Sequence, residues 1–123
     1  MRYDPLKDPD PEEWLELDEA LRIKIVEDYH RRKRIRMPSV RAHAAIQAVV
    51  ETQIAMGRSH PAKAVLRRLM LEGLDRHDAV HAIGSVLAAQ MYEMMTSGSS
   101  DNNQEYERKL SELTAASWLK SGG

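Results

Sequence analysis

The sequence predicts an all-α fold, a bundle of four to five helices in a single domain. Apolar residues recur at spacings of three and four along most of the chain, which is the repeat of an amphipathic helix. Pro38, Gly57, Pro61 and Gly73 separate the periodic segments. The apolar residues are mainly Leu, Ile, Val, Ala and seven Met, with no Phe, and such side chains pack well between closely spaced helices.

Length, composition and net charge limit the functional classes to which the protein can belong. A chain of 123 residues with 42% hydrophobic content is long enough for one buried core. A net charge of −1 argues against general nucleic-acid binding, and the absence of cysteine excludes a disulfide scaffold and a cysteine zinc site. No apolar run reaches 18 residues and the N-terminus lacks the apolar segment of a secretory signal, so we expect a cytoplasmic protein without a membrane partner.

Residues 1–10 carry two prolines and three aspartates, which predicts an extended N-terminal arm. We expect this arm to pack on the helices through Tyr3 and Leu6. Asp10 and Pro11 then form a helix start signal, an N-cap followed by proline at the first helical position, for a short helix to Leu17.

Asp18 is placed to cap a second helical segment. Leu21, Ile25 and Tyr29 repeat every four residues, so we expect this helix to run into residues 31–34. Further helices are predicted for residues 38–57 and 61–73, each ending at a glycine that suits the left-handed position past a helix end.

The central helix is predicted for residues 75–95, with Asp75 as N-cap and Asp78 three residues later. Its apolar stripe consists of Val80, Ile83, Leu87, Met91 and Met94. We expect the group Met91, Met94 and Met95 to lie in the core. Gly84 and Ala88 lie beside the stripe, and we expect both to be buried where this helix contacts helix 38–57.

Residues 97–101 are rich in serine and predict a flexible connection. Asn102 and Glu105 form a capping pattern for a C-terminal helix, residues 102–119. One face of this helix carries Tyr106, Leu110, Leu113 and Ser117.

Three histidines are the candidate metal ligands. His77 and His81 lie one helical turn apart at the edge of the apolar stripe, and His43 lies at the edge of the stripe of helix 38–57. If these two helices run parallel, His43 is roughly 7 Å above its helix start, and His77 and His81 are roughly 3 and 9 Å above theirs. The three imidazoles then lie at similar heights along the two helix axes.

Neutral imidazoles with an open position suit one divalent metal, zinc or a similar ion, and Gln47 could be a weak fourth ligand or an outer partner. Glu51, expected towards solvent at roughly 20 Å and opposite Ala89, is a poor co-ligand. Without a buried carboxylate near the ion, catalysis is not favoured. The alternative is that the histidines are structural. In that case His77 caps the helix start and His81 forms a hydrogen bond with a carboxylate or carbonyl group at a packed interface.

A basic run is the second candidate site. The seven residues from His30 to Arg36 include five cations, Arg31, Arg32, Lys33, Arg34 and Arg36, whereas residues 1–29 hold ten acids and four bases. The run could bind an acidic partner or nucleic acid, although the absence of interleaved aromatics argues against nucleic acid. Alternatively, the cations bond the last carbonyls of their helix and pair with the acidic segment. The oligomeric state is left open, homo-oligomers included.

The chain resembles a bacterial family known as domain of unknown function 1841. The resemblance rests on Tyr3-Asp4-Pro5, Glu27-Asp28-Tyr29-His30, His43-Ala44-Ala45-Ile46, residues 50–57, residues 74–84 and Leu113-Thr114-Ala115-Ala116-Ser117-Trp118. In that family the position of Gln47 is more often histidine and that of Ala89 more often glutamate. The resemblance therefore implies two helical stripes of metal ligands, from which this sequence departs at both positions.

Overall fold

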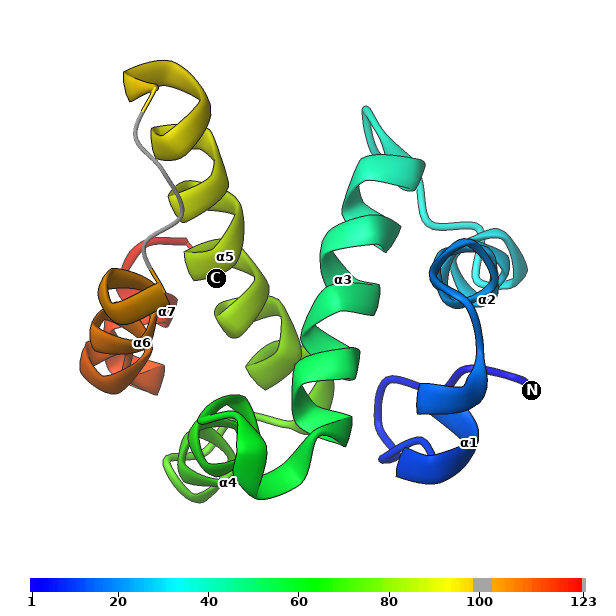
Figure 1. The fold of residues 1–123 in the computed structure, drawn as a ribbon, viewed down its shortest axis with the longest axis horizontal. Helices are drawn as coiled ribbons and strands as arrows, with labels where there is room; N and C mark the ends of the chain where they lie inside the picture. The colour runs from blue at the N-terminus through cyan, green and yellow to red at the C-terminus, as the bar shows by residue number, and fades with distance from the viewer. Residues whose placement is uncertain (99–102, 123) are drawn as a thin grey trace.

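A computed structural model places seven α-helices among the residues that the structure describes, which are residues 1–98 and 103–122, and no strand is found there (Figure 1). The helices are α1 (Pro11–Glu16), α2 (Glu19–Arg32), α3 (Val40–Ala55), α4 (Ala62–Leu71), α5 (Arg76–Ser97), α6 (Asn103–Glu112) and α7 (Ala115–Lys120), with one 3-10 turn, η1 (Gly57–Ser59). The all-α class is confirmed. Within the described ranges no helix is both long and apolar enough to span a bilayer.

Side-chain caps set the helix starts that the sequence predicted. Asp10 accepts a hydrogen bond from the backbone of Glu13, and Asp18 accepts one from Leu21. Asp75 does the same at the start of α5, where its carboxylate lies 2.7 Å from the backbone nitrogen of Asp78. These caps satisfy amide groups that have no partner within the helix.

The predicted number of helices is too low. The count of four to five takes the segment before Pro38 as one helix, but the predicted second cap at Asp18 divides it into two, with Leu17 extended between α1 and α2. The predicted helix 102–119 is broken at Thr114, which is also extended and forms a reciprocal capping box with Ser117. Ser117 is therefore an exposed capping residue of α7 and does not lie on a buried face.

The predicted connection 97–101 begins later than expected. Helix α5 continues through Ser97, and Gly98 ends it in the left-handed conformation, with φ of 69°. The rest of the predicted connection, and the predicted cap at Asn102, lie outside the described residues.

Helix α3 lies between two groups of elements. Helices α1 and α2 lie on one side of it in Figure 1, α5 to α7 lie on the other, and α4 lies at its base. One apolar cluster, on the α1 and α2 side, contains Tyr3, Trp14, Ile25, Val26, Tyr29, Ala44 and Ala48. The second joins α3 to α4, α5, α6 and α7 and includes Val50, Ile54, Leu66, Leu69, Val80, Ile83, Leu110 and Trp118.

Helices α3 and α5 are in contact, as predicted, but they are not parallel. Helix α3 runs down to α4 and α5 rises away from it in Figure 1. The two helices approach closely at Gly84, which faces Ile46 and Val50 of α3. Gly84 is buried, and a Cβ atom there would lie 3.3 Å from Cγ2 of Ile46. Ala88 is exposed, contrary to expectation, because α5 has moved away from α3 one turn beyond the crossing.

The methionines at the end of α5 do not form core. Met91 is 44% exposed and Met95 is 82% exposed. Helix α5 is 22 residues long, and its last turns extend past the neighbouring helices in Figure 1. The periodic pattern continues there without a surface to pack against.

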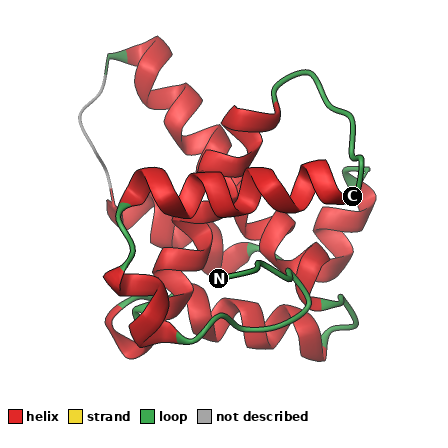
Figure 2. Ribbon diagram, turned by 90° about the vertical axis from the view of Figure 1, so that its right-hand side faces the viewer, coloured by secondary structure: helices red, strands yellow, loops and turns green. Residues whose placement is uncertain are grey.

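The N-terminal arm is held by a buried polar network. The arm crosses the helices as a loop (Figure 2), with Tyr3 buried as predicted, whereas Leu6 is exposed. The Tyr3 hydroxyl donates a hydrogen bond to the carboxylate of Glu51 on α3. Arg76, the first residue of α5, donates to both oxygens of that carboxylate at 2.9 and 2.7 Å.

Arg76 also binds the arm directly. Its Nε donates to Asp8 at 2.8 Å and its guanidinium donates to the Pro5 carbonyl at 2.9 Å. Burial raises the pKa of Asp8, but the hydrogen bonds from Arg76 and Arg67 outweigh this effect and lower it. The buried carboxylate of Glu51, expected towards solvent, is thus the point where the arm, α3 and α5 meet.

We predict that Glu51→Ala lowers the free energy of unfolding by about 3–5 kcal/mol, because it leaves the Arg76 guanidinium buried without its main counter-ion. Glu16→Ala, at an exposed position of α1, is the matched control and should change stability by less than about 0.5 kcal/mol. Urea denaturation followed by circular dichroism measures both. Equal effects of the two substitutions would show that the buried ion pair does not stabilise the fold.

Candidate functional site

Four histidines gather where α2, α3 and α5 meet. The rings of His43 and His81 have centres 4.9 Å apart, and those of His77 and His81 are 4.5 Å apart. The three predicted histidines therefore come together. The fourth ring belongs to His30 near the end of α2, 5.0 Å from His43.

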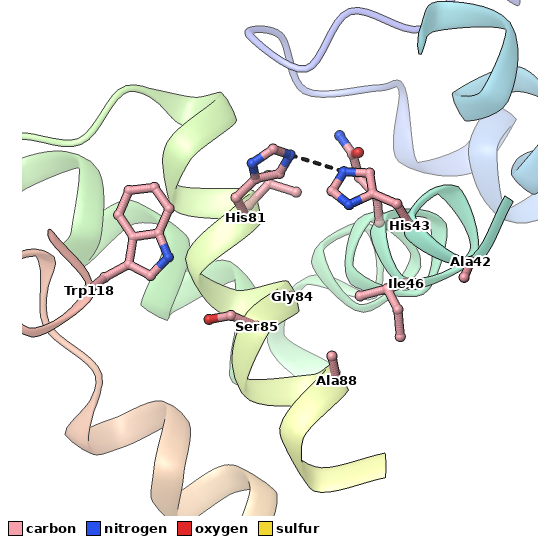
Figure 3. A pocket seen from close by; sticks show the side chains of 10 residues that line it. Ala42, His43, Ile46, His81, Gly84, Ser85, Ala88 and Trp118 are labelled. Atoms are coloured by element: carbon pink, nitrogen blue, oxygen red, sulfur yellow. Dashed lines mark hydrogen bonds between the residues drawn. The ribbon is translucent and has the colours of Figure 1, made fainter. Parts of the chain in front are cut away.

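The crossing of α3 and α5 brings these side chains together. His43 lies in the first turn of α3, while His77 and His81 lie one turn apart near the start of α5. In Figure 3 α5 is seen lengthwise and α3 nearly end-on, with the His43 and His81 rings meeting between them. The parallel arrangement with a common axial level is wrong, and because the helices cross, Glu51 lies beside Arg76 and not opposite Ala89.

Hydrogen bonds restrict the protonation of the rings. The Nε2 atoms of His43 and His81 lie 3.2 Å apart, so one ring donates a hydrogen bond from its Nε2 and the other accepts it. Nδ1 of His30 donates to the carbonyl of Val26 at 2.8 Å, which in the neutral ring leaves the lone pair on Nε2. Nε2 of His77 is buried and has no hydrogen-bond partner among the described residues.

The environment keeps two of the rings neutral. Burial, followed by the neighbouring His77, His43 and His30, lowers the pKa of His81 to about 4. Burial, followed by His30 and His77, also lowers the pKa of His43. Near neutral pH both imidazoles therefore carry a lone pair that can act as acceptor or metal ligand.

Gln47 links this histidine cluster to the network around Glu51. It follows His43 by one helical turn and is 2% exposed. Its amide nitrogen donates to the Tyr3 hydroxyl at 3.0 Å, while its Oε1 atom is buried without a partner in the described part of the chain. The predicted position of Gln47 near His43 is thus found, with one oxygen left unsatisfied.

Two residues at this site, His30 and Glu51, differ from what the sequence predicts. His30 was counted with the basic run, yet it is 1% exposed. A signal was present, since His30 follows Val26 by four residues and so belongs to the buried face of that helix. For Glu51, no pattern in the sequence indicates the buried Arg76 that pairs with it.

As the side chains stand, no three histidine or carboxylate groups within residues 1–98 and 103–122 are arranged to hold a metal ion. One pair nevertheless has the right spacing. Two imidazole nitrogens bound to one tetrahedral zinc at about 2.0–2.1 Å lie about 3.3 Å apart. The Nε2 atoms of His43 and His81, at 3.2 Å, match that separation.

The basic run lies on the surface at the end of α2, and its five cations are exposed. Arg31 pairs with Glu27 and Asp28 at 3.4 and 3.7 Å, which neutralises it in part. Arg32 donates to the Tyr3 carbonyl at 3.0 Å and lies over the Tyr29 ring. Internal pairing, expected as the alternative to partner binding, is therefore present for these two residues.

A groove runs beside the basic run. It has a volume of about 690 Å³ and is lined by four cations, Arg2, Lys7, Arg32 and Lys33, with Asp4 as the one acid among its lining residues. The arm thus adds two positive side chains to the basic run. No pattern in the sequence indicates this contribution, because Arg2 and Lys7 belong to an acidic segment.

Comparison with known proteins adds no family assignment: neither a family model, nor a curated protein, nor a solved structure matches this chain. The resemblance to domain of unknown function 1841 stays a prediction.

We predict that the protein loses stability as the pH falls from about 6.5 to about 4. Residue 81 takes up a proton in the unfolded chain near pH 6.5 but in the folded protein only near pH 4, so protons favour unfolding within this window. Because part of His81 faces solvent, screening reduces the effect to about 1–2 kcal/mol between pH 7 and pH 5. His81→Gln should reduce the difference in the free energy of unfolding between pH 7 and pH 5, measured by urea denaturation at both pH values. An unchanged difference would show that His81 is not the residue responsible.

Proposed function

We propose that the protein binds one divalent transition metal, zinc or a similar ion, at the histidine cluster. The observation that carries the proposal is the 3.2 Å separation of the His43 and His81 Nε2 atoms, which matches two ligands of one tetrahedral ion. His77 is the third ligand in this proposal and is recruited by rotation of its side chain. Neutral imidazoles are the donors that zinc and other borderline divalent ions prefer.

The unpartnered Nε2 atom of His77 also supports a metal ion at this cluster. A buried ring nitrogen without a partner costs free energy, and native proteins keep few such atoms. An ion beside His77, whose ring centre is 4.5 Å from that of His81, would satisfy this atom.

The surroundings of the rings also suit a metal site. The bond from His30 Nδ1 to the Val26 carbonyl has the form by which proteins orient metal-binding imidazoles, so His30 is either a fourth ligand or a support for His43. Gln47, with its free Oε1, is the weak fourth ligand or outer partner that the sequence predicted.

The proposal is for binding and not for catalysis. A catalytic ion needs a free acid or base nearby, and the carboxylate of Glu51 is already engaged by Arg76 and Tyr3. The resemblance to domain of unknown function 1841, which implies metal-binding stripes, supports a metal in the same place. The cytoplasmic location stays a prediction.

Metal binding is tested with protein prepared without a histidine tag. We expect one metal per chain, and a free energy of unfolding that rises by about 2.7 kcal/mol when free metal is a hundredfold above its dissociation constant. Elemental analysis measures the first quantity, and urea denaturation with and without chelator measures the second.

The double variant His43→Gln/His81→Gln should lose both effects. His60→Gln is the matched control, because His60 lies outside the histidine cluster, where its Nδ1 accepts a hydrogen bond from the backbone of Ala62. Substoichiometric metal and unchanged denaturation curves in the unaltered protein would leave these residues with a structural role only.

A second function is favoured by the groove beside the basic run. We propose that Arg31, Arg32, Lys33, Arg34 and Arg36 form a surface for an acidic protein partner, extended by Arg2 and Lys7. Lys33, Arg34 and Arg36 make no salt bridge within the described residues, so their charge is available. Nucleic acid is the competing partner, and the run lacks the interleaved aromatics that single-stranded nucleic acids require.

Replacement of Arg31, Arg32, Lys33 and Arg34 by Gln should abolish a salt-sensitive association with an acidic protein partner while leaving the helical content unchanged. The matched control replaces Lys24, Arg58, Lys63 and Lys120, four exposed cations elsewhere, and has the same net charge. Polyglutamate and an oligonucleotide, each tested by fluorescence anisotropy at low salt, distinguish the two classes of partner. Equal binding by the two variants would overturn this function.

A further inference from the structure

A pocket opens directly beside the His43 and His81 pair. It has a volume of about 340 Å³ and lies between α3, α5 and the Trp118 side chain of α7. Figure 3 shows Trp118 on one side of α5 and His43 with Ile46 on the other. Gly84 forms part of the pocket wall on α5, at the point where Ile46 of α3 packs closely against it.

Most of the pocket wall is apolar. Ile46, Val80 and the ring of Trp118 provide its larger side chains, and Ala42 and Ala88 lie on it as small exposed residues. The convergent polar groups are His43, His81 and Gln47, with Ser85 on the α5 side. A mainly apolar cavity of about 300–1,000 Å³ with a few convergent polar groups is typical of a small-molecule site.

The charges favour an anionic ligand. The four rings of the histidine cluster supply no negative charge, so a divalent ion held by them keeps its full charge in partly desolvated surroundings. The carboxylates near the cluster are already engaged: Glu51 pairs with Arg76 and Glu27 with Arg41. Asp75, whose charge acts on His81, caps α5 by accepting a hydrogen bond from the backbone of Asp78. An anion from outside the chain can therefore complete the ion's coordination.

We propose that this pocket binds a small monocarboxylate with an apolar body of about one aromatic ring. The carboxylate completes the coordination of the metal at His43 and His81, and the ring packs on Trp118. This inference rests on the proposed metal site. The pocket volume, at the low end for small-molecule sites, sets the limit of one ring, and the Trp118 indole provides a face on which such a ring can pack.

The test uses protein loaded with cobalt(II), whose visible absorption reports its ligands. Cobalt uptake is measured first, by elemental analysis, so that the metal site and the pocket are judged separately. Benzoate is the probe and acetate, which lacks the apolar body, is its control. Emission of Trp118 is the second readout, because the other tryptophan, Trp14, is fully buried in the cluster around Tyr3 and Tyr29.

We expect benzoate to change the cobalt absorption and the Trp118 emission over the same concentration range. Acetate should require at least a tenfold higher concentration. Ala88→Trp fills the pocket and should weaken benzoate binding at least tenfold with cobalt uptake unchanged. Ala89→Trp, at the exposed neighbouring position that does not line the pocket, should bind benzoate as the unaltered protein does.

Ala42→Trp fills the pocket from α3 and provides a second variant should Ala88→Trp fail to fold. The inference is overturned if benzoate and acetate bind alike, if neither pocket-filling variant weakens benzoate, or if benzoate binds equally without cobalt. Cobalt uptake with no benzoate response overturns the pocket ligand alone, and absence of cobalt uptake overturns both the metal site and this inference.

Discussion

The buried ion pair between Glu51 and Arg76 is the interaction on which the rest of the arrangement depends. It fixes the start of α5 against the C-terminal half of α3, and it recruits the arm through Tyr3 and Asp8. A buried pair of this kind is stabilising only when its remaining hydrogen-bonding capacity is satisfied, and here the Tyr3 hydroxyl and the Pro5 carbonyl do so. The same contact holds α5 at the crossing where His81 meets His43.

Local chemistry made much of the fold predictable. Asp10, Asp18 and Asp75 cap helices by bonds to amides three residues away, which sequence spacing alone specifies. The break at Thr114 was missed, because the apolar spacing continues across it and the capping box with Ser117 was not recognised. The crossing of α3 and α5 was not predictable either, since the direction of packed helices depends on side-chain interdigitation over the whole contact.

The sequence predicted three of the four clustered histidines, but the helix arrangement that brings them together differs from the predicted one. His43 and His81 were placed together on the premise of parallel helices, whereas they meet because both lie near a crossing. The apolar stripe located their helix faces, and this information was enough to bring them into contact. His30 and the pairing of Glu51 depend on contacts between segments far apart in the chain, which no local pattern encodes.

The placement of the arm also constrains the order of folding. The partners of Tyr3 and Asp8 within the polar network lie 48 and 68 positions further along the chain. The loop entropy lost in forming such contacts is recovered only when α3 and α5 already lie together. We therefore expect the arm to dock late, after the helices that it crosses have assembled, and to cover the buried charges that those helices bring together.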